Sequence, residues 1–152
     1  FSAISPFCMS LWTAITSAGE SDMDWTIGDR GFEMVLTAEV PRIVGREVRS
    51  AVQAALGDAP LASAVDAWAV HPGGRSVLDR VEAGLELSLD ALARSRAVLR
   101  EFGNMSSATV LFILQRILED DVLGDAARVV GMAFGPGLTV ETATFTRREK
   151  PA

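Results

Sequence analysis

The sequence is poor in the residues that build metal sites, disulfides and hydrolase triads. Its 152 residues include one cysteine and one histidine, and no Gly-x-Ser-x-Gly motif. A single cysteine, Cys8, cannot form an intramolecular disulfide, so a cytoplasmic protein is expected. One histidine and one cysteine are too few for a metal centre built from these ligands, and no metal is expected. Without the nucleophile elbow, a serine hydrolase is not expected.

Long apolar runs and clustered positive charge are missing as well. No apolar run approaches the ~18–20 residues of a membrane span, so no membrane-spanning segment is expected. No basic residue precedes Arg30, so the N-terminal region lacks the charged segment of a signal peptide. The net charge is -6, whereas a nucleic-acid surface needs clustered Lys and Arg, so no nucleic-acid partner is expected.

The residues that are present suit one globular domain. Hydrophobic residues make up 49% of the chain and charged residues 22%, which is ample for a core and a soluble surface. The strongest periodicity predicts a helix over 40–56, with Val44, Val48 and Val52 on one face, Pro41 in the first turn and Gly57 at the end.

Strands and helices are expected to alternate along the rest of the chain. Strands are predicted over 7–15, 32–36, 67–70, 128–133 and 139–145. Further helices are predicted from Gly74 to about Leu87, over 90–102 and over 106–118. This alternation predicts an α/β domain with a mixed sheet and helices on both faces.

The predicted helix at 106–118 is the most apolar. Val110-Leu111-Phe112-Ile113-Leu114 leaves no polar side, which predicts a helix buried all round. Asn104, just ahead of it, is then expected in the middle of the domain, where an amide without a partner is costly.

Two polar residues at helix starts are the candidate site. His71 lies in His71-Pro72-Gly73-Gly74, between a predicted strand and a helix, and Asn104 precedes the apolar helix. Helix starts favour negative charge, and a neutral imidazole and an amide both donate hydrogen bonds. Two such donors converging on one point would form an oxyanion hole. Taken singly, a histidine such as His71 is more often structural, and Asn104 is equally well explained as an ordinary helix cap.

Three segments together carry a resemblance to a known family. In order and spacing, 71–74, 103–108 and 134–141 resemble the C-terminal half of the type III polyketide synthases, the chalcone and stilbene synthase family. The resemblance implies one half of a thiolase-like fold, with a family-like domain over 24–146. Residues 1–23 match poorly and are expected to mark a truncation boundary, and 147–152 form a tail.

The resemblance also implies a chemistry. The family is an acyltransferase with a Cys-His-Asn triad that uses acyl-CoA and malonyl-CoA as substrates and needs no cofactor. His71 would hold the cysteine as a thiolate. His71 and Asn104 would bind the thioester carbonyl of malonyl-CoA and stabilise the enolate left by loss of CO2. The enolate then attacks the acyl-cysteine and lengthens the chain by two carbons.

The nucleophile of that triad has no counterpart here. In the family it lies in an N-terminal half, and Cys8 does not match it, so Cys8 is interpreted as a small hydrophobe. We therefore expect a partner, the missing N-terminal half that carries the cysteine, and a homodimer for the full enzyme. That expectation also accounts for a first residue that is Phe1 rather than Met.

Six more residues are expected to line the substrate pocket. Met34 matches a position where plant members often carry a gatekeeping phenylalanine, which suggests room for aliphatic acyl chains; ordinary core packing is the alternative. Pro136 and Gly137 match the loop that shapes the cyclisation cavity. The remaining members of the expected pocket are Gly73, Gly74 and Ser106.

Two other functions stay open. A 3-ketoacyl synthase is a related condensing enzyme that also uses His and Asn, although the segment 135–139 favours the polyketide family. The chain is otherwise an inactive fragment that serves only as a structural or binding module.

Overall fold

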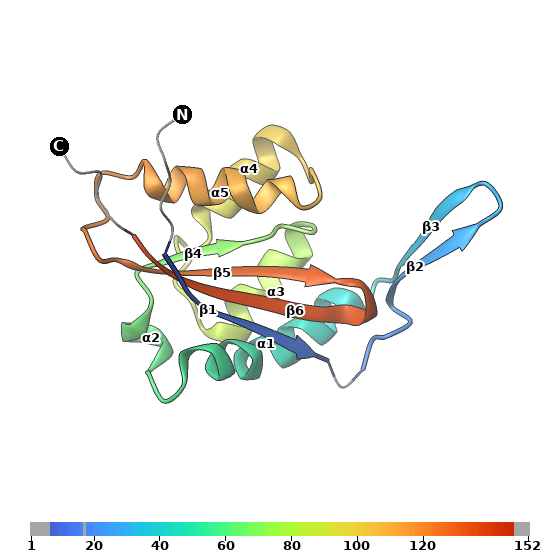
Figure 1. Ribbon diagram of the computed structural model, residues 1–152, viewed down its shortest axis with the longest axis horizontal. Helices are drawn as coiled ribbons and strands as arrows, with labels where there is room; N and C mark the ends of the chain where they lie inside the picture. The colour runs from blue at the N-terminus through green and yellow to red at the C-terminus, as the bar shows by residue number, and fades with distance from the viewer. Residues whose placement is uncertain (1–6, 17, 148–152) are drawn as a thin grey trace.

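A four-stranded mixed sheet forms the centre of the molecule. The structure, a computed structural model, describes residues 7–16 and 18–147 (Figure 1). The strand order is β1-β6-β5-β4, in which β1 pairs with β6 and β6 with β5 antiparallel, and β5 with β4 parallel. The strands span Phe7–Ile15 (β1), Ala67–Val70 (β4), Arg128–Gly135 (β5) and Thr139–Thr146 (β6). The side chain of Cys8, interpreted above as a small hydrophobe, lies outside the described part of the structure.

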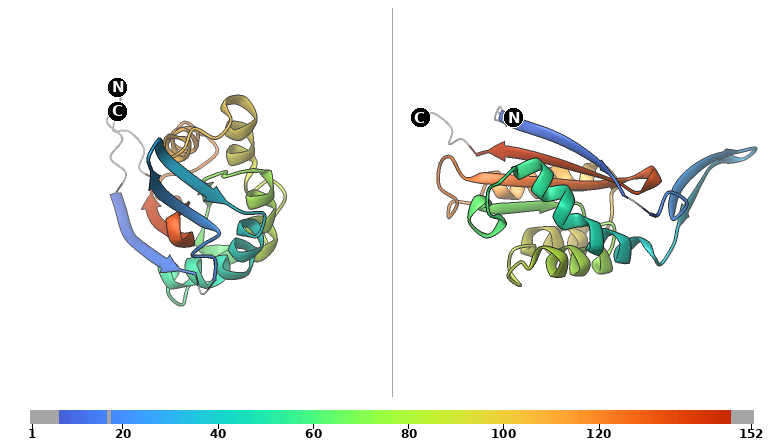
Figure 2. Two further views of the ribbon diagram at one scale, coloured as in Figure 1. Left: turned by 90° about the vertical axis from the view of Figure 1, so that its right-hand side faces the viewer. Right: turned by 90° about the horizontal axis from the view of Figure 1, so that it is seen from below.

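Helices cover both faces of this sheet, as predicted (Figures 1 and 2). On one face lie α1 (Val40–Leu56) and α3 (Arg75–Leu85), and on the other α4 (Ala93–Phe102) and α5 (Ala108–Leu118). Side chains alternate along a strand, so β4 contributes to both cores. Trp68 and Val70 pack with α1 and α3, whereas Ala67 and Ala69 pack with α4 and α5.

Helix α1 has the bounds that its periodicity predicts. Its residues Val44, Val48 and Val52 are fully buried against the sheet side of the core. The helix crosses α3 at two glycines: a Cβ on Gly84 would lie 2.5 Å from the carbonyl oxygen of Gly45. The two backbones meet closely because neither glycine has a side chain at the crossing.

A separate hairpin projects from one end of the molecule (Figure 1). It consists of β2 (Met23–Gly28) and β3 (Gly31–Leu36). Paired residues of an antiparallel hairpin point to the same side. One side of the hairpin is therefore entirely apolar; this hairpin face comprises Met23, Trp25, Ile27, Phe32, Met34 and Leu36. Strand β2 was not predicted, although Met23, Trp25 and Ile27 alternate with polar residues as in a half-buried strand.

The prediction that the last helix is buried all round is wrong. Leu111 and Phe112 on α5 are 63% and 39% exposed. Asn104 is also exposed rather than central. The described residues place only one sheet face against α5, so the opposite side of the helix has no layer over it.

Several boundaries also differ from those predicted. Helix α4 begins at Ala93 rather than at residue 90 and buries Ser95 and Val98, while Phe102 at its end is half exposed. Helix α3 ends at Leu85, α5 begins at Ala108, and β5 runs on to Gly135 before a 3-10 turn, η1 (Pro136–Leu138). The four-residue helix α2 (Leu61–Ala64) is too short to show a period in the sequence. Among the described residues no helix is long and apolar enough to cross a bilayer.

Candidate functional site

The candidate site begins where β4 ends. His71 directly follows β4, and its backbone N–H donates to the Met132 carbonyl of β5 at 2.8 Å, which extends the parallel pairing by one residue. The Gly73 N–H donates back to the His71 carbonyl at 3.1 Å, so the chain turns tightly before α3. The carboxyl ends of parallel strands are the usual place for a ligand crevice in α/β folds.

The environment of His71 favours its neutral form. Its side chain is half-buried, and burial lowers the pKa of His71 from the usual value of 6.5. A neutral imidazole keeps one nitrogen as a donor and leaves the other as an acceptor. His71 can therefore donate a hydrogen bond and accept a proton in the same site.

Asn104 reaches this turn from the other face of the sheet. Its side-chain amide Nδ2 donates to the Gly73 carbonyl at 3.3 Å, and its Oδ1 accepts from the Ser106 N–H at 2.9 Å. One amide thus joins the start of α5 to the turn that follows His71. The second N–H of the amide has no acceptor among the described residues and is available to a ligand.

Thr109 is a supporting residue that the sequence reasoning missed. Its hydroxyl is completely buried and accepts from the Met105 N–H at 2.8 Å. This bond fixes the backbone between Asn104 and α5, where Ser106 adopts a left-handed φ of 58°. A threonine in the first turn of a helix is the available sequence signal, since its hydroxyl can satisfy an unpaired N–H there.

The elements that carry the other predicted site residues lie toward the same end of the molecule (Figure 1). Gly74 lies between the turn and α3, and Ser106 lies exposed ahead of α5. Pro136 and Gly137 form η1 at the end of β5, and η1 contacts β2 of the hairpin. Met34 is 54% exposed on the hairpin face, so the described structure does not pack it as core.

Two cavities lie elsewhere in the molecule. Their volumes are about 210 and 310 Å³, and neither is lined by a predicted site residue.

Sequence comparison decides the family. The profile of the family described as "Chalcone and stilbene synthases, C-terminal domain" matches residues 10–147. The chain belongs to the chalcone and stilbene synthase family. It corresponds to the C-terminal domain of a type III polyketide synthase, which confirms the resemblance drawn from the three segments.

Two relatives show how much of such an enzyme the chain spans. It is 29% identical over 144 residues to the protein named "Putative chalcone synthase" of Bacillus subtilis (strain 168), covering 94% of the chain and 40% of that protein. The crystal structure of PKS-I from the brown alga Ectocarpus siliculosus superposes with a TM-score of 0.82 at 26% identity, covering 91% of the chain and 38% of PKS-I. The chain thus spans about two fifths of the length of both proteins and has the fold expected, the C-terminal half of a thiolase-like fold.

Proposed function

We propose that this domain supplies the histidine and asparagine of an acyltransferase that condenses malonyl-CoA onto a starter acyl group. The family supports this reading at the coarse level of a type III polyketide synthase domain. The observation that carries the finer reading is the hydrogen bond from the Asn104 amide to the Gly73 carbonyl, two residues after the half-buried His71, whose pKa burial lowers.

The proposed reaction has three steps: acyl transfer to the cysteine, decarboxylation of malonyl-CoA, and condensation. A cysteine thiolate, kept reactive by His71, takes the starter acyl group and releases CoA. In bound malonyl-CoA the bond to the carboxylate breaks, CO2 leaves, and the electron pair moves into the thioester carbonyl. His71 and Asn104 donate to the resulting enolate oxygen, each worth about 3–4 kcal/mol in the transition state. The enolate carbon then attacks the acyl-cysteine carbonyl, the new C–C bond forms, and the thiolate leaves.

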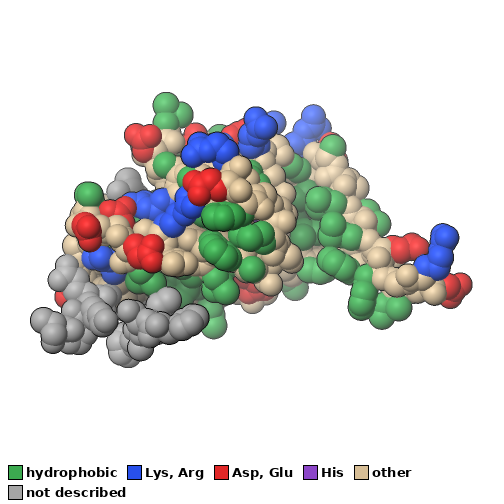
Figure 3. All heavy atoms as spheres, turned by 90° about the horizontal axis from the view of Figure 1, so that it is seen from above, with side chains coloured by type: hydrophobic (Ala, Val, Ile, Leu, Met, Phe, Trp, Pro, Cys, Tyr) green, Lys and Arg blue, Asp and Glu red, His purple; other side chains and the backbone are tan. Residues whose placement is uncertain are grey.

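The cysteine belongs to a partner in this proposal. An N-terminal half would carry it, corresponding to the part of the relatives that the chain does not cover. The uncovered sides of α5 and β1 support such a partner. Leu11 and Ile15 of β1 are 77% and 78% exposed, and their register with β6 places them on the same side of the sheet as α5. Hydrophobic side chains gather on this side of the molecule and along the hairpin (Figure 3).

The complete enzyme is proposed to be a homodimer that works without a metal or cofactor. Its pocket would accept aliphatic starters, because the flexible Met34 stands where plant members often carry phenylalanine. Comparing coumaroyl-CoA with fatty acyl-CoA starters tests this part alone. A clear preference for the aromatic starter would contradict the aliphatic pocket and leave the condensation itself untouched.

The decisive experiment separates decarboxylation from condensation. The chain is joined to the uncovered N-terminal part of the Bacillus subtilis relative, and malonyl-CoA turnover is followed in His71→Ala, Asn104→Ala and the exposed control Gln115→Ala. We expect each site variant to lose about 10²–10³-fold in decarboxylation rate, and the control to match the parent.

The products and the His71→Ala variant discriminate between the functions. A cyclised polyketide supports the proposal, whereas a product extended once and left linear favours a 3-ketoacyl synthase. Decarboxylation that is unchanged in His71→Ala would contradict the assigned role. A fusion that folds but turns over no malonyl-CoA would leave a structural module as the function.

A further inference from the structure

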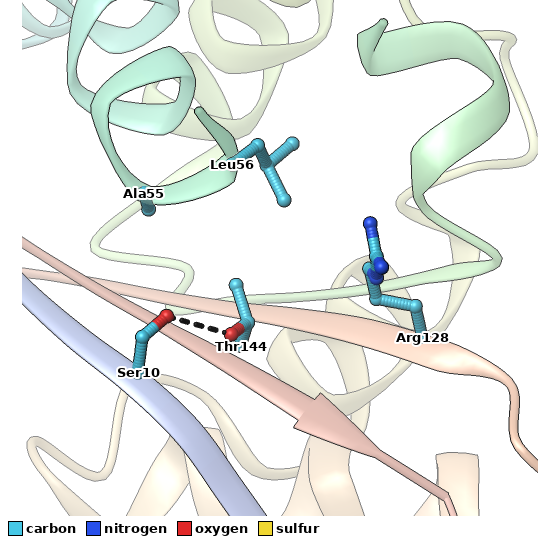
Figure 4. A pocket seen from close by; sticks show the side chains of 5 residues that line it. All are labelled: Ser10, Ala55, Leu56, Arg128 and Thr144. Atoms are coloured by element: carbon cyan, nitrogen blue, oxygen red, sulfur yellow. Dashed lines mark hydrogen bonds between the residues drawn. The ribbon is translucent and has the colours of Figure 1, made fainter. Parts of the chain in front are cut away.

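The smaller of the two cavities described above lies at the end of β5 away from the candidate site (Figure 4). Its volume is about 210 Å³. The sheet forms its floor, and the last turn of α1 forms its roof; the lining residues are Ser10, Ala55, Leu56, Arg128 and Thr144. Arg128 begins β5, and His71 lies beside Met132, four residues further along that strand, so about 13 Å of strand separates the two. The cavity is therefore distinct from the site of the proposed condensation.

Arg128 carries the only charge in this cavity. It is half-buried, yet among the residues that the structure describes its guanidinium has no ion-pair partner and donates no hydrogen bond. Three other half-buried arginines, Arg94, Arg96 and Arg116, each face a carboxylate. A guanidinium has five N–H donors and no acceptor, so its donors are aimed at the cavity without a protein counter-ion.

A buried hydroxyl stands beside the arginine. Thr144 is 6% exposed, and its Oγ1 lies 2.9 Å from the Oγ of Ser10 (Figure 4). Either oxygen can donate in that bond, and when Ser10 donates, the proton of Thr144 can be given to a ligand. The cavity therefore offers a planar cation and a nearly desolvated hydroxyl, both of which suit an oxygen anion.

The surroundings select among anions. The last turn of α1 is the negative end of a helix dipole, and the Asp66 carboxylate lies close by, since its Oδ2 accepts from the Arg128 N–H at 2.7 Å. Both oppose a multiply charged anion such as phosphate. Ala55 and Leu56 in the roof provide apolar contact for a short aliphatic tail. A guanidinium pairs with a carboxylate through two parallel hydrogen bonds.

We propose that the Arg128 cavity binds a small aliphatic monocarboxylate, with the carboxylate on the Arg128 guanidinium and the Thr144 hydroxyl and the tail against Leu56. The site lies on the side of the sheet that α1 covers, away from the surface assigned above to the N-terminal partner. An occupant here would tie the end of α1 to three strands of the sheet.

The test is a butyrate titration of the chain followed by NMR. The Arg128 side-chain Nε–Hε signal is assigned by its loss in Arg128→Gln. Butanol, phosphate and sodium chloride at matched ionic strength are the comparison solutes. We expect a saturable shift with butyrate, a much weaker response to phosphate, and none with butanol or chloride.

Matched variants decide the result. Arg128→Gln should weaken binding at least about tenfold, Thr144→Val should weaken it less, and Arg42→Gln, an exposed arginine outside the cavity, should bind as the parent does. Thr144→Val keeps the arginine and serves if Arg128→Gln loses its fold. A shift that is not saturable, equal affinity for phosphate and butyrate, or unaltered binding in both cavity variants would overturn the proposal.

Discussion

At the scale of the residue, backbone chemistry joins Asn104 to the turn that follows His71. The tight turn after β4 presents the Gly73 carbonyl to the Asn104 amide, while Thr109 holds the chain between Asn104 and α5. A replacement at any of these positions acts on the site through geometry before it acts on the chemistry.

The titration of His71 follows from its burial. Its folded-state pKa lies below the unfolded value of about 6.5, so the unfolded chain binds the proton more readily. The stability contributed by neutral His71 is complete above pH 6.5 and falls as the pH drops through the folded pKa. We expect an NMR titration of the His71 ring, unambiguous because it is the only histidine, to give a midpoint below 6.5. A midpoint at or above 6.5 would show that a negative group, and not burial, dominates its environment.

Asn104 also contributes to the stability of the fold, and this contribution can be measured separately from activity. Asn104→Ala removes the hydrogen bonds to Gly73 and Ser106, and we expect the free energy of unfolding to fall by about 0.5–2 kcal/mol in urea denaturation. Gln115→Ala, at an exposed position on α5, is the control and should change stability by less than about 0.5 kcal/mol. An Asn104→Ala protein as stable as the control would mean that the amide is held only loosely in the unliganded domain.

At the scale of the element, the close crossing of α1 and α3 depends on two glycines, Gly45 and Gly84. A Cβ at Gly84 would lie 2.5 Å from the Gly45 carbonyl oxygen and 2.7 Å from Val48 Cγ1, too close for any atom. We expect Gly84→Ala to lower the free energy of unfolding by about 1–3 kcal/mol, despite the better helix propensity of alanine. Gly124→Ala has nothing within 4 Å of its new Cβ and is the control. Equal stability of the two variants would show that the helices separate at little cost.

The elements that were predictable are those whose partners lie within the chain. Helix α1 and strand β4 could be predicted because their apolar residues pack inside the described domain. His71 and Asn104 could be predicted as candidates because each stands just ahead of a helix. The position of helix α5 was predicted correctly, but its burial was not, because nothing in the described structure covers its apolar outer side. The pairing of β2 with β3 was missed, and most of the hairpin face is exposed: of its six residues only Met23 packs against the core. Periodicity reports that a face is apolar and does not report what covers it.

At the scale of the whole molecule, the uncovered faces should govern behaviour in solution. An apolar surface over β1, α5 and the hairpin favours self-association of the chain on its own. We expect light scattering to show concentration-dependent oligomers that Leu111→Glu shifts toward monomer. Val122→Glu, at a 92% exposed loop position away from α5, should leave the distribution unchanged. A parent chain that is monomeric at every concentration would contradict this expectation.

The hairpin gives the molecule a built-in optical signal. A two-stranded hairpin has little stability of its own in water, so its order depends on whatever lies against its apolar side. Trp25 stands there, 48% exposed and edge-on to Phe32. When another polypeptide or an acyl group covers that side, the indole leaves water and its fluorescence emission shifts to the blue. The change in Trp25 emission, measured against that of Trp12 and Trp68, thus allows assembly to be timed in a stopped-flow cuvette, with no label attached.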